Sequence, residues 1–224
     1  MANRGKSLIQ EVIEAIEAEG ELPSERMLDA PKPKAAKGLP ASAISELRLS
    51  NGMELPPSLA AWLEYDARWL PLEIADGVVH GTSFAELVTE VVPDVGEMFA
   101  MLGESLLTAE CYRLWVPQMC PEMSAVFLYG AHADNQGELP VLCFAYDDDG
   151  ILGVFAAGFD VYLARVMGVC EDVSYAIGEG PPAYAKASKA ALEALLKAAD
   201  PAVRKQVYVS QGVISVGSLI QFDG

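Results

Sequence analysis

Residues 139–156 read LPVLCFAYDDDGILGVFA, and this stretch decides the fold class of the chain. Two apolar runs, 139–146 and 151–156, flank a polar turn made of aspartates and a glycine. Apolar and aromatic runs bounded by an Asp- and Gly-rich turn are typical of a β-hairpin. We therefore predict paired antiparallel strands over these two runs.

The segments around this hairpin add strands and helices. Residues 124–129 predict one more strand, and 207–220, around Gln211-Gly212, predict a final hairpin. Apolar residues at helical spacing predict helices, or loops with helical turns, over 7–19, 41–49, 84–92, 95–107, 159–167 and 184–199, with another beginning at Pro56-Pro57. A strand block between helices predicts an α+β fold with a largely antiparallel central sheet flanked by helices.

The N-terminal part predicts a separate organisation. Residues 7–19 place their apolar side chains on one helical face, with Ser7 as the expected N-cap and Gly20 as the stop. Residues 23–40 are rich in proline and lysine, which is typical of a linker. We predict an amphipathic helix with its linker over 1–38 and a single α+β globular domain over 39–224. The helix either docks on this domain or acts as a partner-binding arm.

Composition limits the class of protein. The chain has 224 residues, of which 52% are hydrophobic and 21% charged, which is typical of a globular protein. No apolar run reaches the roughly 18 residues that a membrane helix needs. Glutamates interrupt 7–19, so this segment lacks the apolar core of a signal peptide. We expect a cytosolic protein.

The negative charge is concentrated in the middle of the chain. Residues 51–160 hold 18 of the 32 acidic residues but only 2 of the 15 lysines and arginines, for a net charge of −16 out of −17. Such a segment repels nucleic acid and anionic lipid and attracts a basic partner. General solubility is the alternative explanation, but the uneven placement favours a partner.

Motifs for catalysis or for a cofactor are missing from the sequence. The cysteines form no CxxC pair, and neither His80 nor His132 stands near a cysteine pair, which argues against zinc. There is no G-x-S-x-G elbow and no phosphate-binding glycine loop. Nothing in the sequence brings Cys111 or Cys120 close to His132. We predict no catalytic residue, no metal and no cofactor, and we assign Trp62 and Trp69 to the core.

Five acidic residues flank the strand predicted over 139–146. They are Asp134 and Glu138 before it and Asp147, Asp148 and Asp149 after it. Carboxylates can ligate calcium, but the spacing of Asp134 and Glu138 is not that of an EF-hand loop. A run of aspartates before a glycine is more often a solvated hairpin tip.

Three motifs in order resemble the SUKH superfamily. Residues 44–63 contain Ile44-x-x-Leu47, Ser50-Asn51-Gly52 and the run LPPSLAAWL, which resembles the opening helix, Leu-Pro turn and aromatic-containing helix of that family. Residues 140–155 resemble its paired central strands with an acidic turn, and 159–164, FDVYLA, resemble its closing helix. The resemblance covers 44–167. The chain departs from the family in the place of Asn51-Gly52 before Leu-Pro, in the long segment 73–117, and in both terminal extensions.

The resemblance implies a bacterial immunity protein, a cytosolic inhibitor without enzymatic activity that binds a cognate toxin, often one that targets nucleic acid. The charge pattern agrees, because an acidic inhibitor can plug the basic cleft of such a toxin. We expect a basic toxin as partner, with no nucleic acid and no membrane, and the residues expected to face it are Asp134, Glu138, Asp147, Asp148 and Asp149. The alternatives are a hydrolase that uses carboxylates or a divalent metal, and a scaffold that docks through its first helix.

Overall fold

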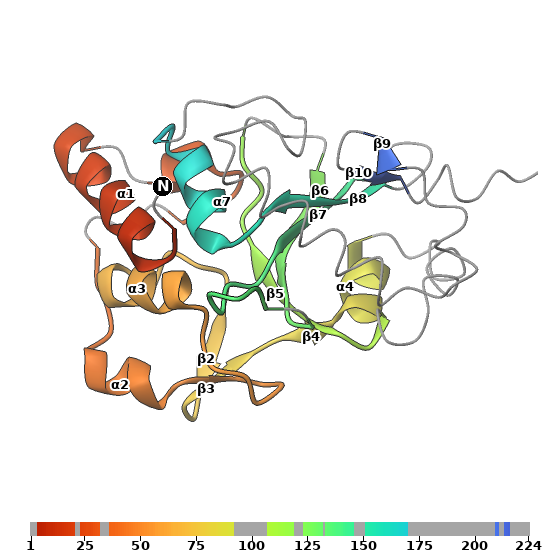
Figure 1. The fold of residues 1–224 in the computed structure, drawn as a ribbon, viewed down its shortest axis with the longest axis horizontal. Coiled ribbons are helices and arrows are strands. Elements are labelled where there is room, and N and C mark those ends of the chain that lie inside the picture. The colour runs from red at the N-terminus through yellow and green to blue at the C-terminus, as the bar shows by residue number, and fades with distance from the viewer. Residues whose placement is uncertain are drawn as a thin grey trace, which may run out of the picture.

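A computed structural model describes residues 4–20, 23–31, 36–91, 107–118, 123–131, 133–145, 151–169, 209–210 and 213–215. The helices are α1 (Lys6–Glu19), α2 (Ala41–Glu46), α3 (Pro57–Tyr65), α4 (Phe84–Val91) and α7 (Phe159–Val166), with a 3-10 turn over Pro23–Arg26. Helices and mostly antiparallel strands form an α+β fold, as predicted (Figure 1).

The central sheet has seven strands in the order β4-β5-β6-β7-β8-β10-β9, and every pairing in it is antiparallel. The strands are β4 (Thr82–Ser83), β5 (Glu110–Leu114), β6 (Met123–Tyr129), β7 (Val141–Ala145), β8 (Ile151–Ala156), β9 (Val209–Ser210) and β10 (Val213–Ser215). The hairpin predicted from 139–156 is confirmed as β7 and β8, and the strand predicted over 124–129 is confirmed as β6. Part of the final hairpin is confirmed as β9 and β10.

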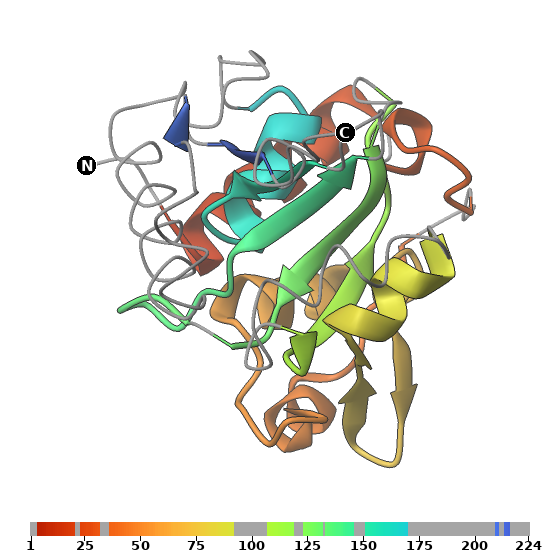
Figure 2. The same cartoon turned by 90° about the vertical axis from the view of Figure 1, so that its right-hand side faces the viewer.

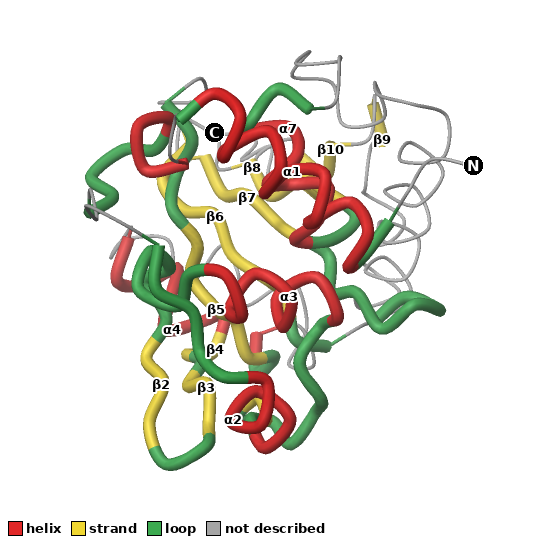
Figure 3. The backbone as a smooth tube through the Cα atoms, turned by 90° about the vertical axis from the view of Figure 1, so that its left-hand side faces the viewer, coloured by secondary structure: helices red, strands yellow, loops and turns green. Residues whose placement is uncertain are grey.

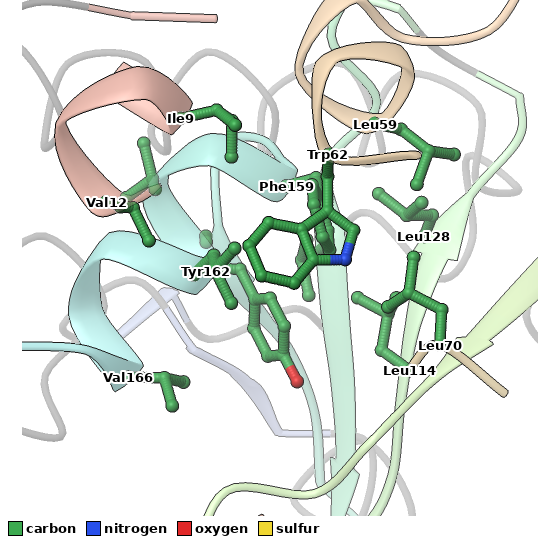
Figure 4. Packing of buried hydrophobic residues seen from close by; sticks show 14 of the residues in the cluster. Ile9, Val12, Leu59, Trp62, Leu70, Leu114, Leu128, Phe159, Tyr162 and Val166 are labelled. Carbon is green, nitrogen blue, oxygen red and sulfur yellow. The ribbon is translucent and has the colours of Figure 1, made fainter. Parts of the chain in front are cut away.

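Helices cover both faces of the central sheet (Figures 1 and 2). Helices α1, α3 and α7 lie together on one face, and α4 lies on the other (Figure 2). The face toward α1, α3 and α7 holds the largest side chains of the core. Trp62 on α3 lies 6.4 Å from Phe159 on α7 between ring centroids, and Tyr162 packs beside them (Figure 4). Trp69 is buried as predicted, 5.3 Å from Trp62, but it follows the end of α3 and does not share its helical face.

Helix α1 belongs to this core. Its apolar side chains are buried against α3 and α7; they are Leu8, Ile9, Val12, Ile13 and Ile16. Gly20 ends the helix in the left-handed region, with φ of 71°, as predicted. The N-cap is Gly5, so the prediction of Ser7 was wrong. The apolar face of α1 is therefore occupied within the protein, which leaves it unavailable as a docking arm.

A second, three-stranded sheet in the order β1-β3-β2 was not predicted. Its strands are β1 (Arg48–Leu49), β2 (Glu73–Ala75) and β3 (Val78–His80). The helix expected over 41–49 ends at Glu46 because the chain turns extended at Leu47 and Leu49 pairs with β3. Asp76 and Gly77 join β2 to β3 with φ of 51° and 77°, which is the backbone of a two-residue hairpin turn.

Two predicted helices cannot be compared with the structure. The helix predicted over 184–199 and most of that predicted over 95–107 lie outside the described residues. In the described part of the chain, no helix combines the length and the apolar character that crossing a bilayer requires.

Candidate functional site

The loop between β6 and β7 holds two of the predicted partner-facing acids, and it folds around one of them. Asp134 Oδ1 accepts the backbone N–H groups of Gln136 and Glu138 at 2.8 and 2.9 Å. Asp134 N–H in turn donates to Glu138 O at 2.8 Å. An aspartate that bonds the backbone ahead of it is a common way to close a turn. This closed turn directs the Glu138 side chain into the protein.

Glu138 meets the first turn of α3, which begins without a side-chain cap of its own. Ser58 N–H donates to Glu138 Oε1 at 2.9 Å, and Ser58 Oγ donates to Oε2 at 2.5 Å. The orphan N–H groups of a helix start need an acceptor, and the positive end of the helix dipole favours an anion there. Glu138, 80 residues away in sequence, supplies the acceptor for the Ser58 N–H at this helix start.

Asp160 plays the same part for α1. Its Oδ2 accepts the backbone N–H of Gly5 and Nε of Arg4, each at 2.6 Å. The Arg4 guanidinium also lies 3.5 Å from Asp134 Oδ2. We call the group Arg4, Ser58, Asp134, Glu138 and Asp160 the buried carboxylate cluster. It joins the starts of α1, α3 and α7 to the loop before β7.

The cluster carries more negative than positive charge, with three carboxylates around one guanidinium. Burial, together with the nearby Asp160 charge, raises the pKa of Glu138 to about 7, although the Ser58 hydrogen bonds and Arg4 act in the opposite direction. A buried carboxylate with a raised pKa beside a second carboxylate is also a pattern of acid–base catalysis. Here the side chains of Glu138 and Asp160 are both 0% exposed, so no substrate reaches them in this arrangement.

The structure therefore corrects one predicted site residue. Glu138 was expected to face a partner, and that prediction was wrong. Its carboxylate is buried inside the protein, where it accepts hydrogen bonds at the start of α3. Asp134 is partly exposed and is engaged by its own turn and by Arg4. Asp147, Asp148 and Asp149 lie outside the described residues, as does His132, while Cys111 is buried.

Sequence reasoning missed Arg4, Ser58 and Asp160. A partial signal existed, because α1 and α3 begin after Gly5 and Pro56, which offer no side-chain acceptor. Such helix starts require an acceptor from elsewhere in the fold. Which residue supplies it depends on packing across long sequence separations, and the local pattern does not contain it.

The exposed charges of the described residues are predominantly acidic. Four cations are exposed among these described residues: Lys6, Lys37, Arg48 and Arg68. Twelve acids are exposed on the same part of the chain: Glu14, Glu17, Glu19, Glu25, Asp29, Glu46, Glu54, Glu64, Glu73, Asp76, Glu86 and Glu90. The described side chains include no group of three or more His, Cys, Asp or Glu arranged to hold a metal ion. The exposed charge of the described residues is thus predominantly negative.

Comparison with known proteins adds a fold relationship. No family model matches the chain, and no curated protein matches it. Its fold is similar to the crystal structure of an uncharacterised protein from Salmonella enterica subsp. enterica serovar Typhimurium, with a TM-score of 0.58 and 20% sequence identity. The similarity covers 89% of this chain and 95% of the other. At this identity the likeness establishes the α+β architecture.

Proposed function

We propose that this chain is a cytosolic immunity protein that binds and inhibits a basic toxin domain, one that acts on nucleic acid, through its acidic surface. The observation that carries the proposal is the threefold excess of exposed acids over exposed cations on the described residues. Such a surface speeds association with a basic partner and disfavours nucleic acid itself. The resemblance of 44–167 to the SUKH superfamily points to the same class of function.

An inhibitor of this kind acts by occupying a cleft, and it requires no reacting group of its own. The buried carboxylate cluster fits that role as a structural element, because its two fully buried carboxylates hold helix starts in place. The exposed acids then supply the negative charge that attracts cations of the partner.

Co-expression tests the proposal directly. The polypeptide encoded immediately upstream is expressed from an inducible promoter, with and without this protein, and growth is followed. We expect growth arrest that this protein relieves, together with a purified complex whose Kd rises steeply with salt. Growth arrest without relief, and no complex at low salt, would reject the proposal.

A further inference from the structure

The small sheet has one face inside the protein and one face open. Leu49 and Val79 are buried and Ile74 packs against the core, so these three side chains fix the inner face. Strand alternation places the neighbouring residues on the outer face. The outer face consists of Arg48, Ser50, Glu73, Ala75, Val78 and His80, all of them exposed or partly exposed. Figure 3 shows this sheet and α2 standing apart from the layer of α1, α3 and α7.

The outer face has a small apolar centre. Ala75 and Val78 are directly paired across β2 and β3, and both are partly exposed. Protein interfaces commonly have an apolar centre and a polar rim. This face has the same arrangement on a small scale, with the alanine and the valine at its centre and polar residues around them. Among the described strands, β2 pairs with β3 alone.

Acidic residues surround this centre. Asp76 occupies the turn, and the carbonyl oxygen of Glu46 lies 3.9 Å from where a Cβ of Gly77 would stand. Glu54 lies opposite Arg48 in an isolated antiparallel backbone β-bridge, and Glu110 accepts the Ser50 hydroxyl at 2.5 Å. With Glu73 these make five carboxylates against one cation, Arg48, whose guanidinium donates to Ser45 O and Leu47 O. The rim is therefore strongly negative.

The face is held rigid by contacts to the central sheet. Ser50 Oγ accepts the Gly81 N–H at 2.9 Å, and Asn51 Nδ2 donates to Gly130 O at 2.9 Å. A Cβ on Gly130 would lie 2.8 Å from Glu110 O, so the strands at this junction pack closely. A binding face that is already ordered loses little conformational entropy when it binds.

From this geometry we infer that the outer face of the β1-β3-β2 sheet is where a basic protein docks, with apolar contact at Ala75 and Val78 and cations paired to the surrounding carboxylates. The inference rests on the proposed function and deepens it by naming the contact surface. A second copy of this chain does not fit, because two such faces would bring their negative rims together.

Two charge-reversal variants distinguish binding at this face from a general effect of the net charge of the protein. The test variant is Glu46→Lys with Glu73→Lys, and the control is Glu14→Lys with Glu17→Lys on the outward side of α1; all four glutamates are exposed. Both variants change the net charge equally, and in each a lysine replaces a glutamate near the C-terminal end of a helix, where a cation is favourable. The titrants are the upstream-encoded polypeptide, by calorimetry, and a lysine decapeptide, by amide chemical shifts of the labelled protein.

We expect the test variant to raise the Kd for the polypeptide at least about tenfold more than the control does, because charges that pair with the polypeptide are lost only in the test variant. We also expect the decapeptide to change the amide chemical shifts of residues 46–50 and 73–80 more than those of α1. Equal losses in the two variants, or decapeptide shifts spread evenly over α1 and the sheet, would overturn it. A polypeptide that fails to bind the wild type would instead reject the proposed function, while the decapeptide still reports on the face.

Discussion

Asp160 Oδ2 accepts the backbone N–H of Gly5 at 2.6 Å, across 155 residues of sequence. The bond joins the start of α1 to the first turn of α7. Arg4 Nε donates to the same Asp160 oxygen at 2.6 Å. Because Asp160 is fully buried, its charge depends on these partners for compensation. The N-terminal segment is therefore an integral part of the fold.

Replacing Arg4 with alanine is expected to destabilise the protein. The substitution leaves the buried Asp160 carboxylate without its cation, which costs about 3–5 kcal/mol for a broken buried pair. Urea unfolding followed by circular dichroism measures the loss. The control is Lys6→Ala, because the Lys6 side chain is 72% exposed and its carboxylate partner lies 3.9 Å away. Similar unfolding midpoints for the two variants would contradict the role of Arg4.

Glu138 predicts how stability depends on pH. Its pKa is raised to about 7 in the folded protein from a usual 4.5, so the native state holds a proton that the unfolded chain has released. The free energy of unfolding should therefore fall as pH rises from 4.5 through 7, by up to roughly 3 kcal/mol from this group. Glu138→Gln should remove most of that slope and keep the bond from Ser58 N–H. Denaturant titrations at pH 5, 6, 7 and 8 test this, with exposed Glu64→Gln as the control; an unchanged slope in Glu138→Gln would refute the assignment.

Trp62 predicts a difference between two substitutions. Its indole is 1% exposed and contacts Tyr65, Trp69 and Phe159, yet its Nε1 has no hydrogen-bond partner among the described residues. Trp62→Ala should cost about 3–5 kcal/mol through the cavity that it leaves. Trp62→Phe should cost clearly less, because it keeps most of the ring and removes an unsatisfied N–H. Thermal and urea unfolding compare the two variants, and equal costs would contradict this account of the Trp62 packing.

Helix α4 begins with a reciprocal cap. Glu86 N–H donates to Ser83 Oγ at 3.2 Å, and Ser83 N–H donates to Glu86 Oε2 at 3.1 Å. The Ser83 hydroxyl, the Ser83 N–H and the Thr82 hydroxyl all donate to Glu86 Oε2, and these bonds lower the pKa of Glu86. Ser83→Ala should cost about 1 kcal/mol, the usual loss for an N-cap. Ser83→Asp restores an acceptor and should recover most of it; equal losses in unfolding experiments would show that the cap contributes nothing.

The two sheets differ in how far local sequence predicts them. Strand β8 was found at its observed bounds, because 151–156 is a compact apolar run behind an Asp-Gly turn. Strand β5 was missed because Glu110 and Arg113 interrupt its pattern, and its pairing with β4 and β6 decides its conformation. The β2–β3 hairpin did have a local signal in Asp76-Gly77, which is a favoured pair for such turns.

The residues of the candidate site are harder to predict from local sequence than the strands are. Glu138 stands next to a turn and reads as a surface residue, but its burial follows from where α3 starts, 80 residues earlier. Asp160 likewise acquires its role from Gly5 and Arg4. Pairings at such separations are fixed by the packing of helices on the sheet, and single-sequence periodicity carries no information about them.

The tie between Gly5 and Asp160 also sets an order of events during translation. Helix α1 leaves the ribosome long before α7, and at about 5–20 residues per second the 155 residues that separate Gly5 from Asp160 take roughly 8–30 s to synthesise. Throughout that time the apolar side chains of α1 lack the surface that α7 later provides. The apolar face of α1 therefore stays partly uncovered until α7 emerges, even after α3 is available, which makes the nascent chain a natural client for a ribosome-associated chaperone.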